Sequence, residues 1–304
     1  MKAFAKKLSL MLAFMMLATM LVACNGHTFA EDPSKLVEAK NFAAEAQKPG
    51  VVVVDMQSEE DYAAGHVVGA VNIPSSDIVI SVPVPNMLTT SKKLAKLMGK
   101  MGISNDTQIL VYDSDRMSAA RFLWTMLMYG NENVRVVNGG VEALKAAGVA
   151  MDTSPVTPEK TSFETGEPRQ NWLATTDDVL AQVNNPDPNV VLLDVRSMEE
   201  YMEGGKIPTA ILMNYTGNYY SDNTLKSVQA TRINYMQAGI FPENEIIIYC
   251  KTSFRAAPVF LALYEAGYRN LRIYDGAWLE WTSVSDRPVE MPEGAAVPVI
   301  KDAS

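Results

Sequence analysis

The sequence has 304 residues, of which 48% are hydrophobic and 20% are charged, a composition typical of globular proteins and a length sufficient for two domains. Its net charge of -9 disfavours nucleic acid and anionic membrane surfaces as binding partners. With two histidines, two cysteines and no Cys/His cluster, the sequence predicts no metal site, and nothing in it calls for a bound cofactor.

Residues 1–23 are predicted to be a secretion signal peptide. Lys2, Lys6 and Lys7 form a basic start, and the apolar stretch LSLMLAFMMLATMLVA leads to Cys24. This stretch is shorter than the ~20 apolar residues that usually span a bilayer, which favours a signal peptide over a transmembrane helix.

The four residues LVAC, Leu21 to Cys24, resemble the bacterial lipobox, whose cysteine becomes the lipidated N-terminus after cleavage. The resemblance implies that Cys24 carries acyl chains and that the protein is exported to the cell envelope and anchored to a membrane by lipid. The alternative is an ordinary cleavage site near Ala23 with an incidental cysteine. With Cys24 lipidated, Cys250 is the single thiol left, so no intramolecular disulfide can form.

One sequence pattern occurs twice along the chain. VVVVDMQSEEDYAAGHVVGAVNIP (51–74) recurs as VVLLDVRSMEEYMEGGKIPTAILMN (190–214), and residues 108–144 match residues 245–281. Matching positions in the two copies lie about 137 residues apart throughout, which indicates duplication of a whole domain.

Each copy alternates short β-branched runs with helical patterns. The runs are VVVVD, ILVY and VRVV in the first copy and IIIY and LRIY in the second. Continuous apolar strands separated by helices predict an α/β fold in which each domain is a parallel sheet flanked by helices. We expect domains over 34–150 and 172–290, a Thr-, Pro- and Glu-rich linker over 151–171, and a tail over 291–304.

Cys250 lies between the apolar run EIIIY and a helix predicted to begin near Ala256 or Ala257 and to run to Gly267. The thiol is therefore expected at the carboxyl end of a parallel strand, where open α/β sheets bind ligands. Loop N–H groups and the positive end of the helix can stabilise an anion there and favour a thiolate, and Lys251 and Arg255 add two cations. The alternative is a buried, inert cysteine at a strand end.

Taken together, these residues resemble the rhodanese (sulfurtransferase) superfamily in its tandem-domain form. The motifs that carry the resemblance are DVRSMEEY and GKIPTA (194–210), the loop from Cys250 to Arg255, YDGAWLEW (274–281), and EEDYAAGHVVGAVNIP and VVNGG in the first copy. The resemblance implies two tandem rhodanese-like domains. It also implies that the N-terminal domain is inactive, because Asp113 stands where the second copy has Cys250; with Asp115 it makes a poor cradle for an anion.

The resemblance further implies a double-displacement reaction without a cofactor. The Cys250 thiolate takes a sulfane sulfur from thiosulfate or 3-mercaptopyruvate, forms a persulfide, and passes the sulfur to a thiophilic acceptor such as cyanide or a thiol. The expected partners are thus a small anionic donor, that acceptor, and a membrane through the N-terminal lipid, with no nucleic acid. A rival hypothesis is a non-catalytic envelope protein that binds or delivers a persulfide.

The resemblance assigns binding of the anionic donor to Arg196 and to the loop that follows Cys250. For Arg196 the alternative is an ion pair with Asp194, or with the following acids Glu199 and Glu200. Loop length disfavours a phosphatase, because four residues separate Cys250 from Arg255 where the related tyrosine phosphatases have five. The loop residues assigned to the substrate are Lys251, Thr252, Ser253, Phe254 and Arg255.

The choice of donor stays open in the sequence. Thr252 is nearer to the serine of the mercaptopyruvate pattern than to the lysine of the thiosulfate pattern. In the former, a His and an Asp of the first domain assist the hydroxyl, and Asp55 and His66 have that spacing. For His66 the alternative is a structural histidine near the sheet edge. Ser253, Phe254 and Arg255 replace the Gly, Val and Thr expected in both tandem subfamilies.

Overall fold

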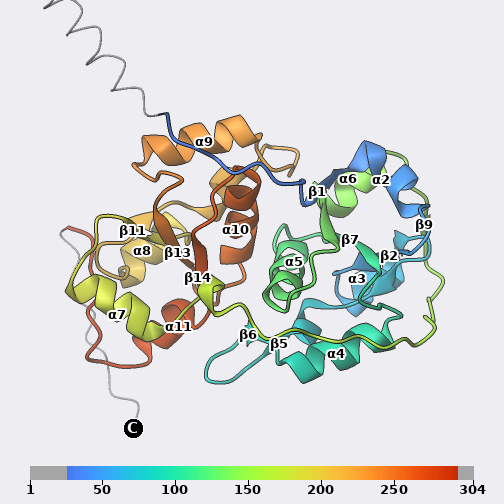
Figure 1. Ribbon diagram of the computed structural model, residues 1–304, viewed down its shortest axis with the longest axis horizontal. Helices are drawn as coiled ribbons and strands as arrows, with labels where there is room; N and C mark the ends of the chain where they lie inside the picture. Colours follow the sequence, from blue (N-terminus) through green and yellow to red (C-terminus); the bar gives the residue numbers. More distant parts are fainter. Residues whose placement is uncertain (1–25, 294–304) are drawn as a thin grey trace, which may run out of the picture.

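The computed structural model describes residues 26–293, which form two α/β domains that lie side by side (Figure 1). The predicted signal peptide, Cys24 and most of the predicted tail lie outside the described residues. Among residues 26–293, no helix is both long enough and apolar enough to cross a membrane.

The N-terminal domain is built on a five-stranded parallel sheet in the order β1-β8-β7-β2-β4. Two short antiparallel pairs, β3 with β9 and β5 with β6, complete the domain. Its strands are β1 (Leu36–Glu38), β2 (Val51–Asp55), β3 (His66–Val67), β4 (Val71–Asn72), β5 (Val79–Ile80), β6 (Met87–Leu88), β7 (Gln108–Tyr112), β8 (Val134–Asn138) and β9 (Met151–Asp152). Its helices are α2 (Ala39–Ala46), α3 (Glu59–Ala64), η1 (Ser75–Ile78), α4 (Ser91–Lys100), α5 (Ser118–Met128) and α6 (Gly140–Ala146).

The C-terminal domain repeats this plan with a five-stranded parallel sheet in the order β10-β14-β13-β11-β12. Its strands are β10 (Leu173–Ala174), β11 (Val190–Asp194), β12 (Ile211–Leu212), β13 (Glu245–Tyr249) and β14 (Leu271–Tyr274). Its helices are η2 (Gln170–Trp172), α7 (Thr176–Asn184), α8 (Met198–Gly204), η3 (Tyr215–Asn218), α9 (Val228–Gln237), α10 (Ala256–Glu265) and α11 (Ala277–Thr282). The predicted fold class, two α/β domains with parallel sheets flanked by helices, is confirmed.

The strand pattern decides where the Cys250 side chain lies. Successive side chains of a strand point to opposite faces of the sheet. Ile246 and Ile248 of β13 therefore pack into the cluster that contains α10, whereas Ile247 and Tyr249 pack into the cluster on the other face. Cys250 continues the first set and is buried in the same cluster as α10.

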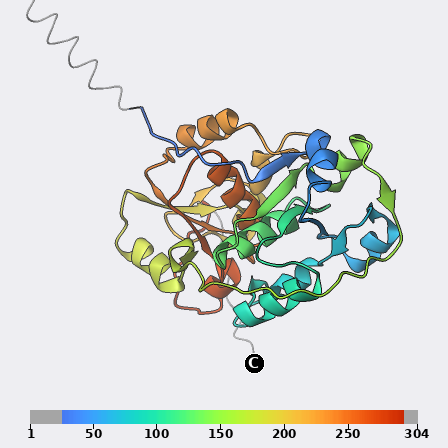
Figure 2. The ribbon, with the colours of Figure 1, turned by 45° about the vertical axis from the view of Figure 1, so that its right-hand side comes forward.

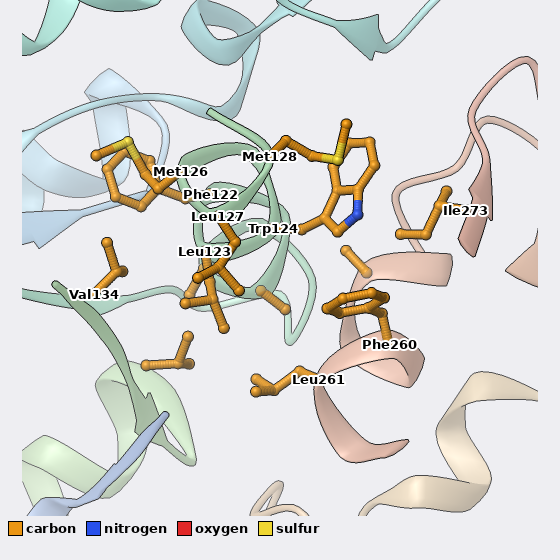
Figure 3. Close-up of a cluster of buried hydrophobic side chains, with 14 of the residues drawn as sticks. Phe122, Leu123, Trp124, Met126, Leu127, Met128, Val134, Phe260, Leu261 and Ile273 are labelled. Carbon is orange, nitrogen blue, oxygen red and sulfur yellow. The ribbon is translucent and has the colours of Figure 1, made fainter. Parts of the chain in front are cut away.

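Helices α5 and α10 form the centre of the interface between the domains. All residues of α5 are buried, as are those of α10 from Ala256 to Leu263, because each helix is covered by its own sheet and by the other helix. Figure 3 shows their side chains in one hydrophobic cluster, with Trp124 of α5 and Phe260 of α10 among them. The two domains thus share a core directly behind the Cys250 loop.

Two connecting segments add contacts between the domains. Residues 26–35 cross the C-terminal domain before β1 begins, and the Ala30 N–H donates to the Gly267 carbonyl at 3.0 Å (Figure 1). After β9 the linker returns along the N-terminal domain, where the Gly166 N–H donates to the Tyr129 carbonyl at 2.9 Å (Figure 2). The segment that leads into the N-terminal domain thus contacts the C-terminal domain, and the linker that leads into the C-terminal domain contacts the N-terminal domain.

Candidate active site

The loop from Cys250 to Arg255 connects the end of β13 to the start of α10. Its first two carbonyls are fixed by α11, because Trp278 N–H donates to the Cys250 carbonyl at 3.0 Å and Leu279 N–H donates to that of Lys251 at 3.2 Å. Cys250 is 1% exposed, whereas Lys251 is exposed. The predicted position of the thiol, at the carboxyl end of a parallel strand, agrees with this geometry.

The backbone N–H groups of residues 251–255 donate no hydrogen bond to any group within residues 26–293. The next two N–H groups, at the start of α10, are hydrogen-bonded: Ala256 N–H donates to the Ser253 carbonyl and Ala257 N–H donates to the Phe254 carbonyl. Consecutive free N–H groups before a helix N-terminus form a ready site for an anion. The loop can therefore hold a negative charge next to the Cys250 sulfur.

The equivalent loop of the N-terminal domain is occupied by its own carboxylates. Asp113 follows β7 and accepts from Ala119 N–H at 2.9 Å, and Asp115 accepts from both Met117 N–H and Ser118 N–H at 2.8 Å. Burial, followed by repulsion from Asp115, raises the pKa of Asp113 to about 7. The first loop thus holds two carboxyl groups from its own sequence, whereas the second loop has no acidic residue between Cys250 and Arg255.

Arg255 is held beside Cys250 by an ion pair with Glu200 of α8. The two guanidinium nitrogens Nη1 and Nη2 lie 2.6 and 2.8 Å from the carboxylate oxygens of Glu200. Burial raises the pKa of Glu200, but the hydrogen bonds from Arg255 and from Ser197 N–H, together with the charges of Arg255 and Arg196, outweigh it and lower the value to about 2. The hydrogen bonds to Glu200 and the interaction with Cys250 raise the pKa of Arg255. The sequence assigned Glu200 to Arg196 as an alternative partner; in the structure it pairs with Arg255.

Arg196 is buried against Asp194 rather than directed to the loop. Its Nη2 lies 2.6 Å from Asp194 Oδ2 and donates to the Gly205 carbonyl at 2.8 Å, and its guanidinium lies 4.1 Å from the Trp278 ring. These contacts are those of the ion-pair alternative. Gln57 makes the corresponding contacts with Asp55 and the Gly65 carbonyl in the N-terminal domain, which indicates a structural role.

Asp55 and His66 do not meet Thr252 in the structure. The buried His66 ring contacts the carbonyl of Tyr62 at 2.8 Å through Nδ1 and that of Ser154 at 3.1 Å through Nε2. Asp55 is buried and accepts hydrogen bonds from Gln57 and Tyr112. Both residues have the contacts expected of structural groups, and an assisting role would require them to leave these partners.

Thr252 is instead contacted by Asn86, in the turn between β5 and β6. Asn86 Nδ2 donates to Thr252 Oγ1 at 3.1 Å. Since the hydroxyl oxygen accepts this bond, its own hydrogen is free to donate to a bound anion. Sequence reasoning missed Asn86 because the turn and the loop lie 166 residues apart.

Ser253 is the second loop residue that the N-terminal domain contacts. Its hydroxyl accepts from Arg121 Nη1 at 2.9 Å and donates to Asp275 Oδ1 at 2.6 Å. Arg121 and Asp275 are themselves a buried ion pair, with Nη2 and Oδ1 2.8 Å apart. The one sequence signal for this group is a lone arginine in the apolar helix SAARFLWTMLM, because an arginine is rarely fully buried unless it is paired.

Comparison with known proteins agrees with the duplicated geometry. Residues 38–147 and 175–284 each match the Rhodanese-like domain. A thiosulfate sulfurtransferase of Corynebacterium glutamicum is 30% identical over 285 residues, which cover 86% of this chain and 92% of that protein. The sulfur carrier protein TtuD of Thermus thermophilus is 28% identical over 282 residues, which cover 86% of this chain and 98% of that protein.

Among solved structures, the anaerobic ergothioneine biosynthesis enzyme from Chlorobium limicola, in complex with trimethyl histidine, has the same fold. It matches with a TM-score of 0.74 and 24% identity, covering 84% of this chain and 70% of that chain. Two domain matches and two curated relatives that span nearly their full length agree with the repeated sheet order and the repeated strand-loop-helix around Asp113 and Cys250. The chain belongs to the rhodanese family, with two rhodanese-like domains in tandem.

Proposed function

We propose that the protein is a sulfurtransferase in which Cys250 carries the transferred sulfur as a persulfide. The observation that supports this most directly is the difference between the two loops. In the N-terminal loop, Asp113 and Asp115 accept hydrogen bonds from the N–H groups of Met117, Ser118 and Ala119, whereas no described residue accepts from the N–H groups of residues 251–255, next to a cysteine. The names of the curated relatives, thiosulfate sulfurtransferase and sulfur carrier protein, agree with this chemistry.

The proposed first step with thiosulfate is attack of the Cys250 thiolate on the outer sulfur. The new S–S bond forms as the S–S bond of thiosulfate breaks, and sulfite leaves with the electron pair. With 3-mercaptopyruvate the C–S bond breaks instead, and the pyruvate enolate that leaves takes up a proton. The free loop N–H groups stabilise the negative charge that stays on the outer sulfur.

The second step returns the thiolate. A cyanide ion or an acceptor thiolate attacks the outer sulfur of the persulfide, and the bond to Cys250 breaks with the electron pair on Cys250. The products are thiocyanate or an acceptor persulfide. The loop N–H groups again face a thiolate, so one electrostatic arrangement supports both halves of the cycle.

Contact with the anionic donor is proposed for the exposed Lys251 and for the Thr252 hydroxyl, with Arg255 beside the sulfur. Ser253 is buried and bonded to Arg121 and Asp275, so it supports the loop rather than meets the donor, and the Phe254 ring lies against the Arg121 guanidinium. This division of roles does not require Arg196, whose guanidinium is occupied by Asp194 and Gly205.

The proposal is tested with Cys250→Ser in a thiocyanate assay, with thiosulfate or mercaptopyruvate as donor and cyanide as acceptor. We expect the wild-type protein to form thiocyanate and to gain the mass of one sulfur atom on Cys250 when donor is added alone. The variant should do neither. Thiocyanate formation that survives in Cys250→Ser would contradict the assignment.

A second function, delivery of a persulfide without turnover, is favoured by the relative named as a sulfur carrier protein. The same experiment separates the two. Sulfur on Cys250 that cyanide and small thiols fail to remove would favour delivery to a specific protein acceptor.

We also propose that the protein is exported and lipid-anchored through Cys24. The support is the basic start, the apolar stretch and the LVAC motif. Mass spectrometry of the mature N-terminus tests this. An acylated Cys24 is expected, and an unmodified Cys24 would contradict the anchor.

A further inference from the structure

The N-terminal domain reaches the Cys250 loop with a buried arginine. Arg121 lies on α5 and is fully buried. Its Nη1 donates to Ser253 Oγ at 2.9 Å, and its Nη2 donates to the Asn86 carbonyl at 2.9 Å and lies 2.8 Å from Asp275 Oδ1. One guanidinium thus joins the catalytic loop, the turn after β5 and the end of β14.

Asp275 completes the connection from the C-terminal domain. Its Oδ1 accepts from the Ser253 hydroxyl at 2.6 Å, and its Oδ2 accepts from Leu88 N–H at 2.5 Å. Both Asp275 and Ser253 are almost completely buried. Removal of any member would leave a buried polar group without its partner, which makes the position of each group well defined.

Ser253 has a backbone conformation that a serine rarely adopts. Its φ is 63°, in the left-handed region that favours glycine. Rotation about φ reorients the peptide before Ser253 relative to the peptide after it. Relaxation to an ordinary φ would therefore change the directions of the Ser253 and Phe254 N–H groups, which are two of the free donors in the loop.

We infer that Arg121 is a positioning residue for sulfur transfer. Together with Asp275 it holds the Ser253 hydroxyl from both sides and so keeps the loop in the left-handed turn that leaves its N–H groups free for the sulfur. The inference rests on the proposed function of Cys250. It gives the N-terminal domain, which lacks the cysteine, a role in positioning the Cys250 loop of the C-terminal domain.

The opposite side of the interface offers a matched comparison. At the corresponding turn of the N-terminal loop, Arg116 has φ 64°, and its carbonyl accepts from the Tyr219 hydroxyl of the C-terminal domain. Asn138 accepts from Leu225 N–H at 2.8 Å there, as Asp275 accepts from Leu88 N–H. Asn138→Ala therefore removes an equivalent contact between the domains without touching the Cys250 loop.

The test uses Arg121→Lys, Ser253→Gly and the double variant in the full-length protein. Arg121→Lys keeps the buried charge but loses the forked geometry of the guanidinium. We expect it to lower the rate of persulfide formation at Cys250 about tenfold, with a change below about twofold in KM for thiosulfate. Glycine adopts a positive φ freely, so in the Ser253→Gly background the effect of Arg121→Lys should fall below about twofold.

Three results would overturn the inference: a wild-type rate in Arg121→Lys, the same loss in both backgrounds, or an equal loss in Asn138→Ala. If Arg121→Lys does not fold, Ser253→Ala is compared with Ser253→Gly. Both lack the hydroxyl and keep the ion pair between Arg121 and Asp275, but only alanine keeps the strained φ. The alanine variant should be the slower, and equal rates would contradict the proposed role.

Failure of the proposed function has a different signature. In that case the wild-type protein forms no persulfide with either donor. Hydrogen exchange still tests the positioning of the loop: the amides of Ala256 and Ala257, which donate to the Ser253 and Phe254 carbonyls, should exchange faster in Arg121→Lys than in Asn138→Ala. Equal exchange in the two variants would overturn the inference.

Discussion

Asp113 and Cys250 occupy equivalent places in the two domains, each directly after the central strand of a parallel sheet and before a buried helix. Asp113 brings a carboxylate into its own loop, where Ala119 N–H donates to it. Cys250 is followed by five N–H groups, those of residues 251–255, from which no described residue accepts a hydrogen bond. A single strand-loop-helix unit is therefore either filled by its own side chains or left open for an external anion.

The first prediction concerns the pH dependence of stability through Asp113. Its pKa is raised to about 7, above that of an unfolded aspartate, so the folded state binds this proton more tightly. The stability that this adds is complete below about pH 4 and is lost as the pH rises to about 7. Asp113→Asn removes this dependence. Urea unfolding should show that the variant gains stability relative to wild type as the pH rises through this range, and a constant difference would contradict the prediction.

The second prediction concerns the ion pair of Glu200 and Arg255. Glu200→Gln leaves Arg255 without its bidentate partner, so the guanidinium beside Cys250 is less well held. We expect kcat/KM for sulfur transfer to fall about tenfold. Glu199→Gln is the control, because Glu199 is an exposed acid on the same helix. An equal loss in the two variants would show a general effect of charge near the site.

The pKa of Glu200 gives a third prediction. Because the value is lowered to about 2, the stabilisation from this pair is present above about pH 4 and is lost as the pH falls toward 2. Urea unfolding at a series of pH values should show that the stability difference between the wild-type protein and the double variant Glu200→Gln/Arg255→Met falls as the pH drops from about 4 toward 2. A difference that stays constant over this range would contradict the prediction.

The fourth prediction separates Asn86 from Asp55 and His66. Asn86→Ala removes the donor to Thr252 Oγ1, so the hydroxyl no longer has a fixed direction toward the donor anion. The ratio of the rates with thiosulfate and mercaptopyruvate should change several-fold, by about the worth of one hydrogen bond. His66→Gln should lower stability, since the ring is stacked on Tyr62 and bonded on both sides, and leave that ratio unchanged. A changed ratio in His66→Gln with none in Asn86→Ala would restore the assisting role of His66.

The fifth prediction concerns Arg196. Arg196→Gln places here the residue that the N-terminal domain has at Gln57, but Asp194 then loses a buried charged partner. We expect a loss of about 3 to 5 kcal/mol in the free energy of unfolding. The KM for thiosulfate should be nearly unchanged in conditions where the variant is folded. A large rise in KM would show that the arginine meets the donor directly.

Much of the fold could be predicted because the relevant signals are local or repeated. Apolar β-branched runs that alternate with helical patterns predict parallel strands covered on both faces, and the second copy confirmed the assignment of the first. The place of Cys250 followed from the same reasoning, since a residue directly after a parallel strand lies at the ligand-binding edge of the sheet.

The partners of the loop could not be predicted in this way. Arg196, Glu200 and Arg255 are three charged groups near one site, and sequence spacing did not decide which of them pair. In the structure Glu200 of α8 forms an ion pair with Arg255, and Arg196 forms one with Asp194. Asp55 and His66 have a suggestive spacing, but hydrogen bonds within their own domain occupy them.

The sequence by itself determined the duplication, the parallel sheets and the cysteine that one copy has in place of an aspartate, because each of these depends on residues close together in the chain. Only the tertiary structure decided that Asn86 and Arg121 of one domain hold Thr252 and Ser253 of the other. These contacts join residues more than a hundred positions apart, and they exist because α5 and α10 are each too apolar to face water and bury their surfaces against one another.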